Sequence, residues 1–178
     1  MPWARWLLPI KVDKINVYKN INIMRWILVD RFTRIQKGKF AQGKRCVTRA
    51  ENALVDSYPC YPVMPSSLLL EMMAQVGGVL AGATIEFGRE VVLAKIADAE
   101  FPLGVTPPME LTIEARMGEL GEDAAMTECQ VSHEKDLVAK ANIFFGLFPG
   151  MGDEGKRSVV FSKDFVESFA LKQIVEHG

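Results

Sequence analysis

Residues 57–75 read SYPCYPVMPSSLLLEMMAQ, a proline-rich lead-in followed by an apolar run. Its three prolines forbid both a helix interior and a central strand, so the lead-in is expected to be rigid and extended. Pro65 suits the first turn of a helix, and Ser66 and Ser67 can cap free amides there. The sequence therefore predicts a helix that begins near Ser66 and runs to about Ala83.

The predicted helix is apolar on almost every side, which is typical of a buried helix. At 1.5 Å per residue it measures about 27 Å, long enough to raise the question of a membrane span. Glu71 argues against a span, because an acid near the centre of a membrane helix costs roughly 2.5–3.5 kcal/mol. We therefore expect no membrane span.

The rest of the chain reads as strands around this helix. Apolar alternation indicates strands at 38–48, 91–94, 99–101, 110–117, 124–132 and 137–148, with residues 133–136 as a hairpin turn. One long buried helix with about five strands is an α+β layout. We expect a peripheral extension at 1–23, the main domain at 24–148, and at 149–178 a linker with one amphipathic helix from Ser162.

Composition excludes several classes of protein. The 178 residues are 49% apolar, enough for a core and too much for a disordered chain. Three cysteines without CxxC spacing argue against a disulfide framework and a zinc site, so a reducing cytoplasm is the default. No metal, nucleotide or flavin motif is present, so we expect neither a metal nor a cofactor. Nothing indicates a nucleic-acid partner.

Positive charge gathers in the first part of the chain. Residues 1–50 hold 12 lysines and arginines against two acids, and residues 24–50 hold eight against one. The distribution predicts one basic face and a charged partner.

Glu71 is the outstanding candidate for chemistry. A carboxylate in an apolar helix loses hydration, which costs several kcal/mol unless something pairs with it. Gln75 lies four residues on and shares its face, so its amide can serve the carboxylate or a ligand. The alternative is a glutamate that caps backbone groups at a subunit interface.

Residues 57–75 resemble the signature of the 3-hydroxyacyl-acyl-carrier-protein dehydratases, which have the hotdog fold. That signature runs His-Phe-Pro-x-x-Pro-hydrophobic-Met-Pro-Gly-x-Leu-x-x-Glu-x-x-Ala-Gln. The likeness extends to ILVDR at 27–31 and to VTPPMEL at 105–111, and it covers residues 24–148.

The resemblance implies a helix wrapped by an antiparallel sheet, a homodimer or higher homo-oligomer, and an active site with residues from both subunits. In the family a histidine removes the α proton of a 3-hydroxyacyl thioester, and the helix glutamate of the partner subunit handles the departing hydroxyl. Amides at the helix start hold the thioester carbonyl. The implied substrate-binding residues are Tyr58, Met64, Pro65, Ser66, Ser67 and Gln75.

Two positions depart from the signature. Ser57 stands at the place of the histidine, and Ser66 replaces the glycine before the helix. A serine hydroxyl does not titrate near neutrality, so Ser57 cannot replace an imidazole as a base unless another group activates it. Asp56 and Cys60 are candidate substitutes, whereas His133, on the hairpin turn, is expected at the surface.

Three functions are compatible with the sequence. The chain is a 3-hydroxyacyl-thioester dehydratase with an atypical site, a non-catalytic acyl-thioester binder, or a thioesterase that uses Glu71. Each implies a partner that presents an acyl group on acyl carrier protein or CoA. Because acyl carrier proteins are acidic, the basic side chains are a possible docking patch: Arg25, Arg31, Arg34, Lys37 and Lys39.

Overall fold

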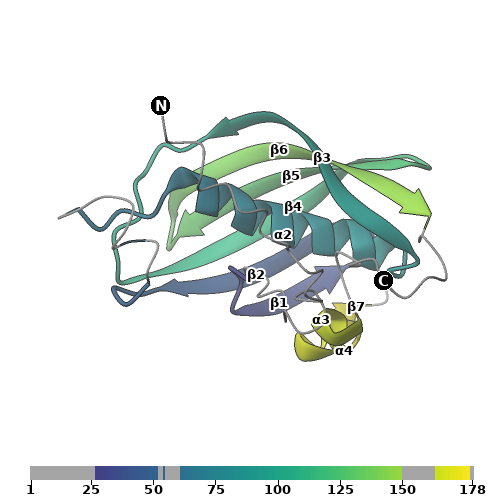
Figure 1. Cartoon of the computed structure of the whole chain (residues 1–178), viewed down its shortest axis with the longest axis horizontal. Helices are drawn as coiled ribbons and strands as arrows, with labels where there is room; N and C mark the ends of the chain where they lie inside the picture. The colour runs from purple at the N-terminus through teal and green to yellow at the C-terminus, as the bar shows by residue number, and fades with distance from the viewer. Residues whose placement is uncertain (1–26, 52–53, 55–60, 150–162, 177–178) are drawn as a thin grey trace, which may run out of the picture.

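The protein is described by a computed structural model that covers residues 27–51, 54, 61–149 and 163–176. A single long helix, α2 (Ser66–Thr84), lies across one face of a seven-stranded sheet (Figure 1). The sheet has the order β3-β6-β5-β4-β2-β1-β7. Its strands are β1 (Arg31–Gln36), β2 (Phe40–Val47), β3 (Arg89–Glu100), β4 (Met109–Leu120), β5 (Ala124–His133), β6 (Asp136–Pro149) and β7 (Val175–Glu176).

Strands β1 to β6 pair antiparallel throughout, and β7 joins the β1 edge in parallel. Side chains of the inner face alternate with polar ones on the outer face, as the residues of β4 show: Leu111, Ile113 and Ala115 are buried, and Glu114 and Arg116 point away. This arrangement confirms the predicted α+β architecture, with an antiparallel sheet wrapped around one helix.

Helix α2 is held close to the sheet by a glycine. A Cβ atom added to Gly77 would lie 2.6 Å from Thr127 Oγ1 and 3.1 Å from Cys129 Sγ, so only glycine permits this approach. The Cys129 thiol in turn lies 3.6 Å from the Met73 carbonyl oxygen of the helix. Twelve residues of α2 are buried. The helix has the length and hydropathy of a membrane span, but 67% of the apolar window is buried inside the fold, as expected of a core helix.

The structure differs from the sequence-based expectation in three places. The apolar run that ends at Asp30 was assigned to no element: Leu28 and Val29 are buried as a lead-in, and the first strand, which was not predicted, begins at Arg31. The strands predicted at 91–94 and 99–101 form one strand, β3, because two register shifts interrupt the alternation without ending the pairing with β6.

The third correction concerns the C-terminus. One amphipathic helix was predicted, whereas the structure has α3 (Lys163–Ser168) and α4 (Leu171–Ile174), separated at Ala170 by a left-handed backbone with φ of 49°. Phe169 packs edge-on against Phe32 of β1, with ring centroids 5.4 Å apart. These two helices and β7 cover the β1 edge of the sheet (Figure 1).

At the opposite edge of the sheet, none of the described segments covers the outermost strand. Strand β3 is 12 residues long and pairs with β6 alone among the described strands. Leu93 and Ile96 are 42% and 37% exposed although their register partners on β6, Phe145 and Ile143, are buried. A long edge strand with exposed apolar side chains is a surface for pairing with another chain.

Candidate functional site

The start of α2 is anchored by backbone hydrogen bonds. The Met64 amide donates to the Val105 carbonyl oxygen at 2.9 Å, which ties the lead-in to the loop before β4. Pro65 is the N-cap, with φ −56° and ψ 134°, and no side chain caps the helix. The expectation that a serine side chain caps the helix was therefore wrong. Ser66 and Ser67 are exposed in the first turn, where backbone amides lack helical partners.

Glu71 and Gln75 form a short chain of hydrogen bonds. The Gln75 Nε2 atom donates to Glu71 Oε1 at 2.9 Å, and Gln75 Oε1 accepts from the Leu28 amide, also at 2.9 Å. Only the side-chain oxygen of Gln75 can accept a hydrogen bond from the Leu28 N–H. This bond therefore orients the Gln75 amide with its nitrogen toward Glu71. The predicted pairing of Gln75 with Glu71 is confirmed.

Glu71 itself lies in a different setting from the one predicted. It is exposed on α2, whereas Met72 and Met73 beside it are fully buried. The apolar composition of the helix suggested a desolvated carboxylate. The sheet covers only one side of α2, however, and Glu71 lies on the side that the described residues leave open. The carboxylate is therefore accessible to a ligand.

The structure brings together only part of the predicted site. Met64 is buried, Pro65 is half-buried, and Ser66, Ser67 and Glu71 are exposed along the first turns of α2. Ser57 and Tyr58 lie outside the described residues, as do the two candidate substitutes, Asp56 and Cys60. Within the described residues no cluster of three side chains is arranged to hold a metal ion.

A partly buried ion-pair network, which was not predicted from the sequence, holds the segments on either side of β2. Arg45 donates to Asp30 Oδ1 at 2.7 Å and to Glu51 Oε2 at 2.9 Å. The second oxygens of the two acids accept the Cys46 and Thr48 amides. Burial works to lower the pKa of Arg45, but the bonds to Asp30 and Glu51 outweigh it and raise that pKa. No sequence spacing signals such a network, because its members are not periodic.

Two further titratable groups, His133 and Cys129, are engaged by other parts of the fold. His133 is half-buried at the end of β5, and its Nδ1 atom lies 2.9 Å from the Glu110 carbonyl oxygen. Burial raises the pKa of the Cys129 thiol to about 11, so this cysteine is inert near neutrality.

The basic residues do not form one patch beside Glu71. Arg31 and Lys44 both pair with Glu110, whose pKa is lowered chiefly by the hydrogen bond from Lys44. Lys37 pairs with Glu86 just beyond the C-terminal end of α2, where Gly38 also donates to Thr84. That end lies about 20 Å along the helix from Glu71. Arg25 lies outside the described residues.

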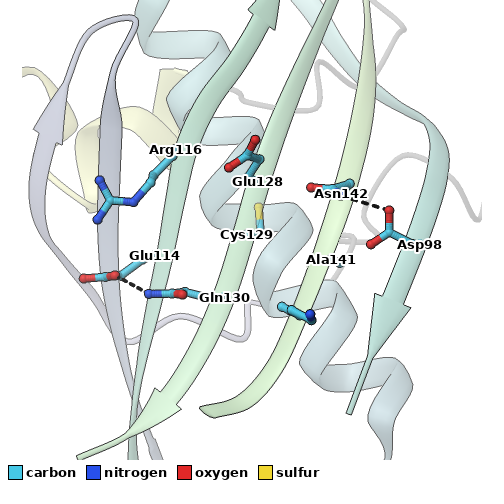
Figure 2. A pocket seen from close by; sticks show the side chains of 9 residues that line it. Asp98, Glu114, Arg116, Glu128, Cys129, Gln130, Ala141 and Asn142 are labelled. Carbon is cyan, nitrogen blue, oxygen red and sulfur yellow. Dashed lines mark hydrogen bonds between the residues drawn. The ribbon is translucent and has the colours of Figure 1, made fainter. Parts of the chain in front are cut away.

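A separate hollow of about 340 Å³ lies on the outer face of the sheet. Figure 2 shows its side chains in front of the strands, with α2 behind them. Two of its carboxylates are already bonded: Gln130 donates to Glu114, and Asn142 donates to Asp98. The hollow therefore lies on the side of the sheet away from Glu71. Some of the polar groups that line it already have hydrogen-bond partners within the protein. It is lined by Asp98, Glu114, Arg116, Glu128, Cys129, Gln130, Lys140, Ala141 and Asn142.

Comparison with known proteins places the chain in a family. Residues 22–142 match the FabA-like domain, and the chain belongs to this family. It is 32% identical over 123 residues to the 3-hydroxyacyl-[acyl-carrier-protein] dehydratase FabZ of Herpetosiphon aurantiacus, a match that covers 68% of this chain and 87% of that protein. It is 33% identical over 136 residues to FabZ of Pelotomaculum thermopropionicum, covering 75% and 97%.

Solved structures confirm the hotdog fold. The dehydratase heterocomplex ApeI:P of Xenorhabdus doucetiae aligns with a TM-score of 0.59 at 15% identity, over 70% of this chain and 84% of that chain. The thioesterase HI1161 of Haemophilus influenzae aligns with a TM-score of 0.54 at 14% identity, over 65% and 76%. The fold is thus shared by proteins described as dehydratases and as thioesterases, so the chemistry has to be argued from the site.

Proposed function

We propose that this protein takes part in the dehydration of 3-hydroxyacyl thioesters carried on acyl carrier protein, in a cytoplasmic pathway of fatty acid or lipid synthesis. The observation that carries the proposal is the Glu71 carboxylate, held by Gln75 and accessible near the start of α2. The match to two FabZ enzymes at 32% and 33% identity supports this substrate class.

The helix start and Glu71 have complementary roles. A thioester carbonyl seated at the first turn of α2 meets backbone amides and the positive end of the helix dipole, which favour the negative charge that develops when the α proton leaves. Glu71 lies one to two turns further along the same helix. From there its protonated carboxyl can give a proton to the departing 3-hydroxyl group, so that water leaves.

Removal of the α proton requires a base, and Glu71 does not supply it in this scheme. Ser57 stands where the family has its histidine, and a hydroxyl does not perform that step unaided. This substitution favours, as a second candidate, a protein that binds acyl thioesters without chemistry. The exposed carboxylate also suits a thioesterase, in which Glu71 acts as base or nucleophile, and one fold neighbour is described as a thioesterase.

We also infer that two chains pair through the open edge of β3. The exposed apolar side chains of Leu93 and Ile96 support this surface, because pairing removes them from water and satisfies the free backbone groups of the edge. The β1 edge is already covered by the C-terminal segment.

One assay separates the three candidate functions. The purified protein is incubated with 3-hydroxyacyl thioesters and with saturated acyl thioesters, and the products are identified by mass spectrometry. Formation of an enoyl thioester supports dehydration, release of free thiol supports hydrolysis, and saturable binding without either product supports a binder. No binding and no turnover of any acyl thioester would refute the proposal.

A further inference from the structure

We propose that the hollow on the outer face of the sheet binds a small zwitterion, a molecule that carries both an ammonium group and a carboxylate group. In this site the ammonium group lies at Glu128 and the carboxylate group lies at Arg116. Helix α2 lies on the other side of the sheet from the hollow (Figure 2), so the inference does not rest on the proposed dehydration at Glu71.

The hollow has the size and the floor of a site for a small molecule. Its volume of about 340 Å³ falls within the range of ligand pockets, about 300–1,000 Å³. Cys129 and Ala141 are register partners on β5 and β6, and their side chains are buried on the inner face of the sheet. The backbone of these two strands therefore forms the floor, and the polar side chains of neighbouring residues surround it (Figure 2).

Two opposite charges lie on neighbouring strands in the hollow without pairing. Glu128 of β5 is the register partner of Arg116 of β4, and cross-strand neighbours of opposite charge stabilise a sheet when they pair. No ion pair joins these two side chains, and within the described residues the Glu128 carboxylate accepts no hydrogen bond. The hollow therefore keeps one negative and one positive group available to a ligand.

The Arg116 guanidinium is held in place by an aromatic ring. Its central carbon lies over the Phe40 ring of β2, 5.2 Å from the ring centroid. Such a cation–π contact uses one flat face of the guanidinium. The N–H groups lie along its edge, where arginine binds a carboxylate through two parallel hydrogen bonds. Arg116 is therefore suited to bind the carboxylate group of the ligand.

Two amides beside Glu128 are held with their oxygens turned inward. Gln130 Nε2 donates to Glu114 Oε2 at 2.7 Å. Asn142, the register partner of Glu128 on β6, donates from Nδ2 to Asp98 Oδ2 at 2.9 Å. A carboxylate accepts hydrogen bonds, so each amide turns its nitrogen to the carboxylate and its oxygen toward the middle of the hollow (Figure 2). These two oxygens and the Glu128 carboxylate together suit the three N–H donors of an ammonium group.

The other charges of the lining are consistent with this orientation of the ligand. Glu114 Oε1 accepts a second amide hydrogen bond, from Gln42 Nε2 at 2.9 Å, so both of its oxygens are engaged. Lys140 pairs at 3.2 Å with Glu100, which lies outside the lining. Asp98, on the β3 side of the hollow, adds negative charge on the side where the ammonium group is placed.

A ligand-observed NMR titration of the full-length protein tests the site. The probes are glycine, β-alanine and 4-aminobutanoate, because the separation of Arg116 and Glu128 selects among their lengths. Propylamine and propionate are control ligands that each carry one of the two charged groups. N,N,N-trimethylglycine is the third control ligand, because it keeps both charges but has no N–H donor.

We expect at least one probe to bind at least about 10-fold more tightly than each control ligand, because every control lacks one charge-assisted set of hydrogen bonds. Binding of the control ligands as tight as that of the probes would overturn the inference. Failure of all three probes to bind would overturn it as well, because the charges of the hollow would then serve only solvent contact.

Three variants locate the binding in the hollow. Glu128→Gln and Arg116→Gln each remove one of the two charges, and each should weaken binding of the best probe by about 10-fold or more. Glu119→Gln removes an exposed carboxylate of β4 that does not line the hollow, so it should bind the probe as wild type does. Circular dichroism confirms that each variant is folded. Unchanged binding by Glu128→Gln, or an equal loss in all three variants, would overturn the inference.

Discussion

The Nε2 atom of Gln75 lies 2.9 Å from Oε1 of Glu71, and the amide that makes this contact is itself held by the Leu28 N–H. Glu71 therefore projects from α2 in one defined position although it is exposed to solvent. An exposed hydrogen bond between side chains four residues apart stabilises a helix by only about 0.2–0.5 kcal/mol, so the main effect of this contact is to fix the position of the carboxylate.

Replacing Gln75 by glutamate tests this contact. Gln75→Glu still accepts the Leu28 N–H, but it no longer donates to Glu71 and places a second carboxylate beside it. We expect kcat to fall by about 10- to 100-fold, with an altered pH profile and little change in stability. The matched control is Gln130→Glu on the outer face, where Gln130 Nε2 donates to Glu114 Oε2 at 2.7 Å. Equal losses of activity in both variants would show that the effect is not specific to Glu71.

A charge on the inner side of β3 is expected to dissociate the assembly. Leu93→Lys would bring an ammonium group into the surface that pairing buries, and desolvation of that charge costs several kcal/mol. Val92→Lys is the control, because Val92 is similarly exposed, at 40%, but pairs with Gly146 on the outer side. Analytical ultracentrifugation should show a smaller species for Leu93→Lys than for Val92→Lys. An unchanged mass for both would place the interface elsewhere.

The sequence predicted the central helix correctly, but it did not predict the structure near the two ends of the described chain. The helix expected at 66–83 is found at Ser66–Thr84, because Pro65 and the unbroken apolar run specify it locally. The buried lead-in at Leu28 and the two short C-terminal helices were missed, because an apolar run does not say whether it forms a strand, and a left-handed turn at Ala170 carries no glycine signal.

Only part of the candidate site could be predicted from the sequence. Glu71 and Gln75 stood out because polar groups are rare in an apolar helix, and their spacing of four residues placed them on one face. Their exposure could not be predicted, because it depends on which side of α2 the sheet covers. The Asp30–Arg45–Glu51 network gave no signal at all, since tertiary contacts alone bring its members together.

Stability above pH 9 should depend on Cys129. Burial raises the pKa of its thiol from 9.0 to about 11, so between these values the unfolded chain binds fewer protons than the folded one. The free energy of unfolding should therefore fall as pH rises through this window, by up to about 3 kcal/mol. Urea denaturation at pH 8 and at pH 11 measures this fall in the free energy of unfolding. Cys129→Ala should lose this component, whereas Cys46→Ala, at an exposed position, should retain it.

The close approach of α2 to the sheet predicts a cost for any side chain at position 77. Gly77→Ala gains up to about 1 kcal/mol of helix propensity, but its Cβ would collide with Thr127 and Cys129, and such overpacking costs about 1–3 kcal/mol. We expect a net destabilisation of about 1 kcal/mol in denaturant titrations. Gly121→Ala, whose Cβ atom would lie 3.6 Å from the Ala124 carbonyl oxygen, should be nearly neutral. A more stable Gly77→Ala protein would contradict this account of the packing.

The central claim is that Glu71 is the acid that acts on the acyl thioester, and the most direct measurement is the rate of enoyl thioester formation by the protein purified from its own organism, with and without Glu71→Gln. The glutamine keeps the shape of the side chain but cannot donate a proton from a carboxyl group. We expect the rate to fall by about 100- to 10,000-fold while acyl thioester binding is retained. A Glu71→Gln protein that forms enoyl thioester as fast as wild type would contradict the account.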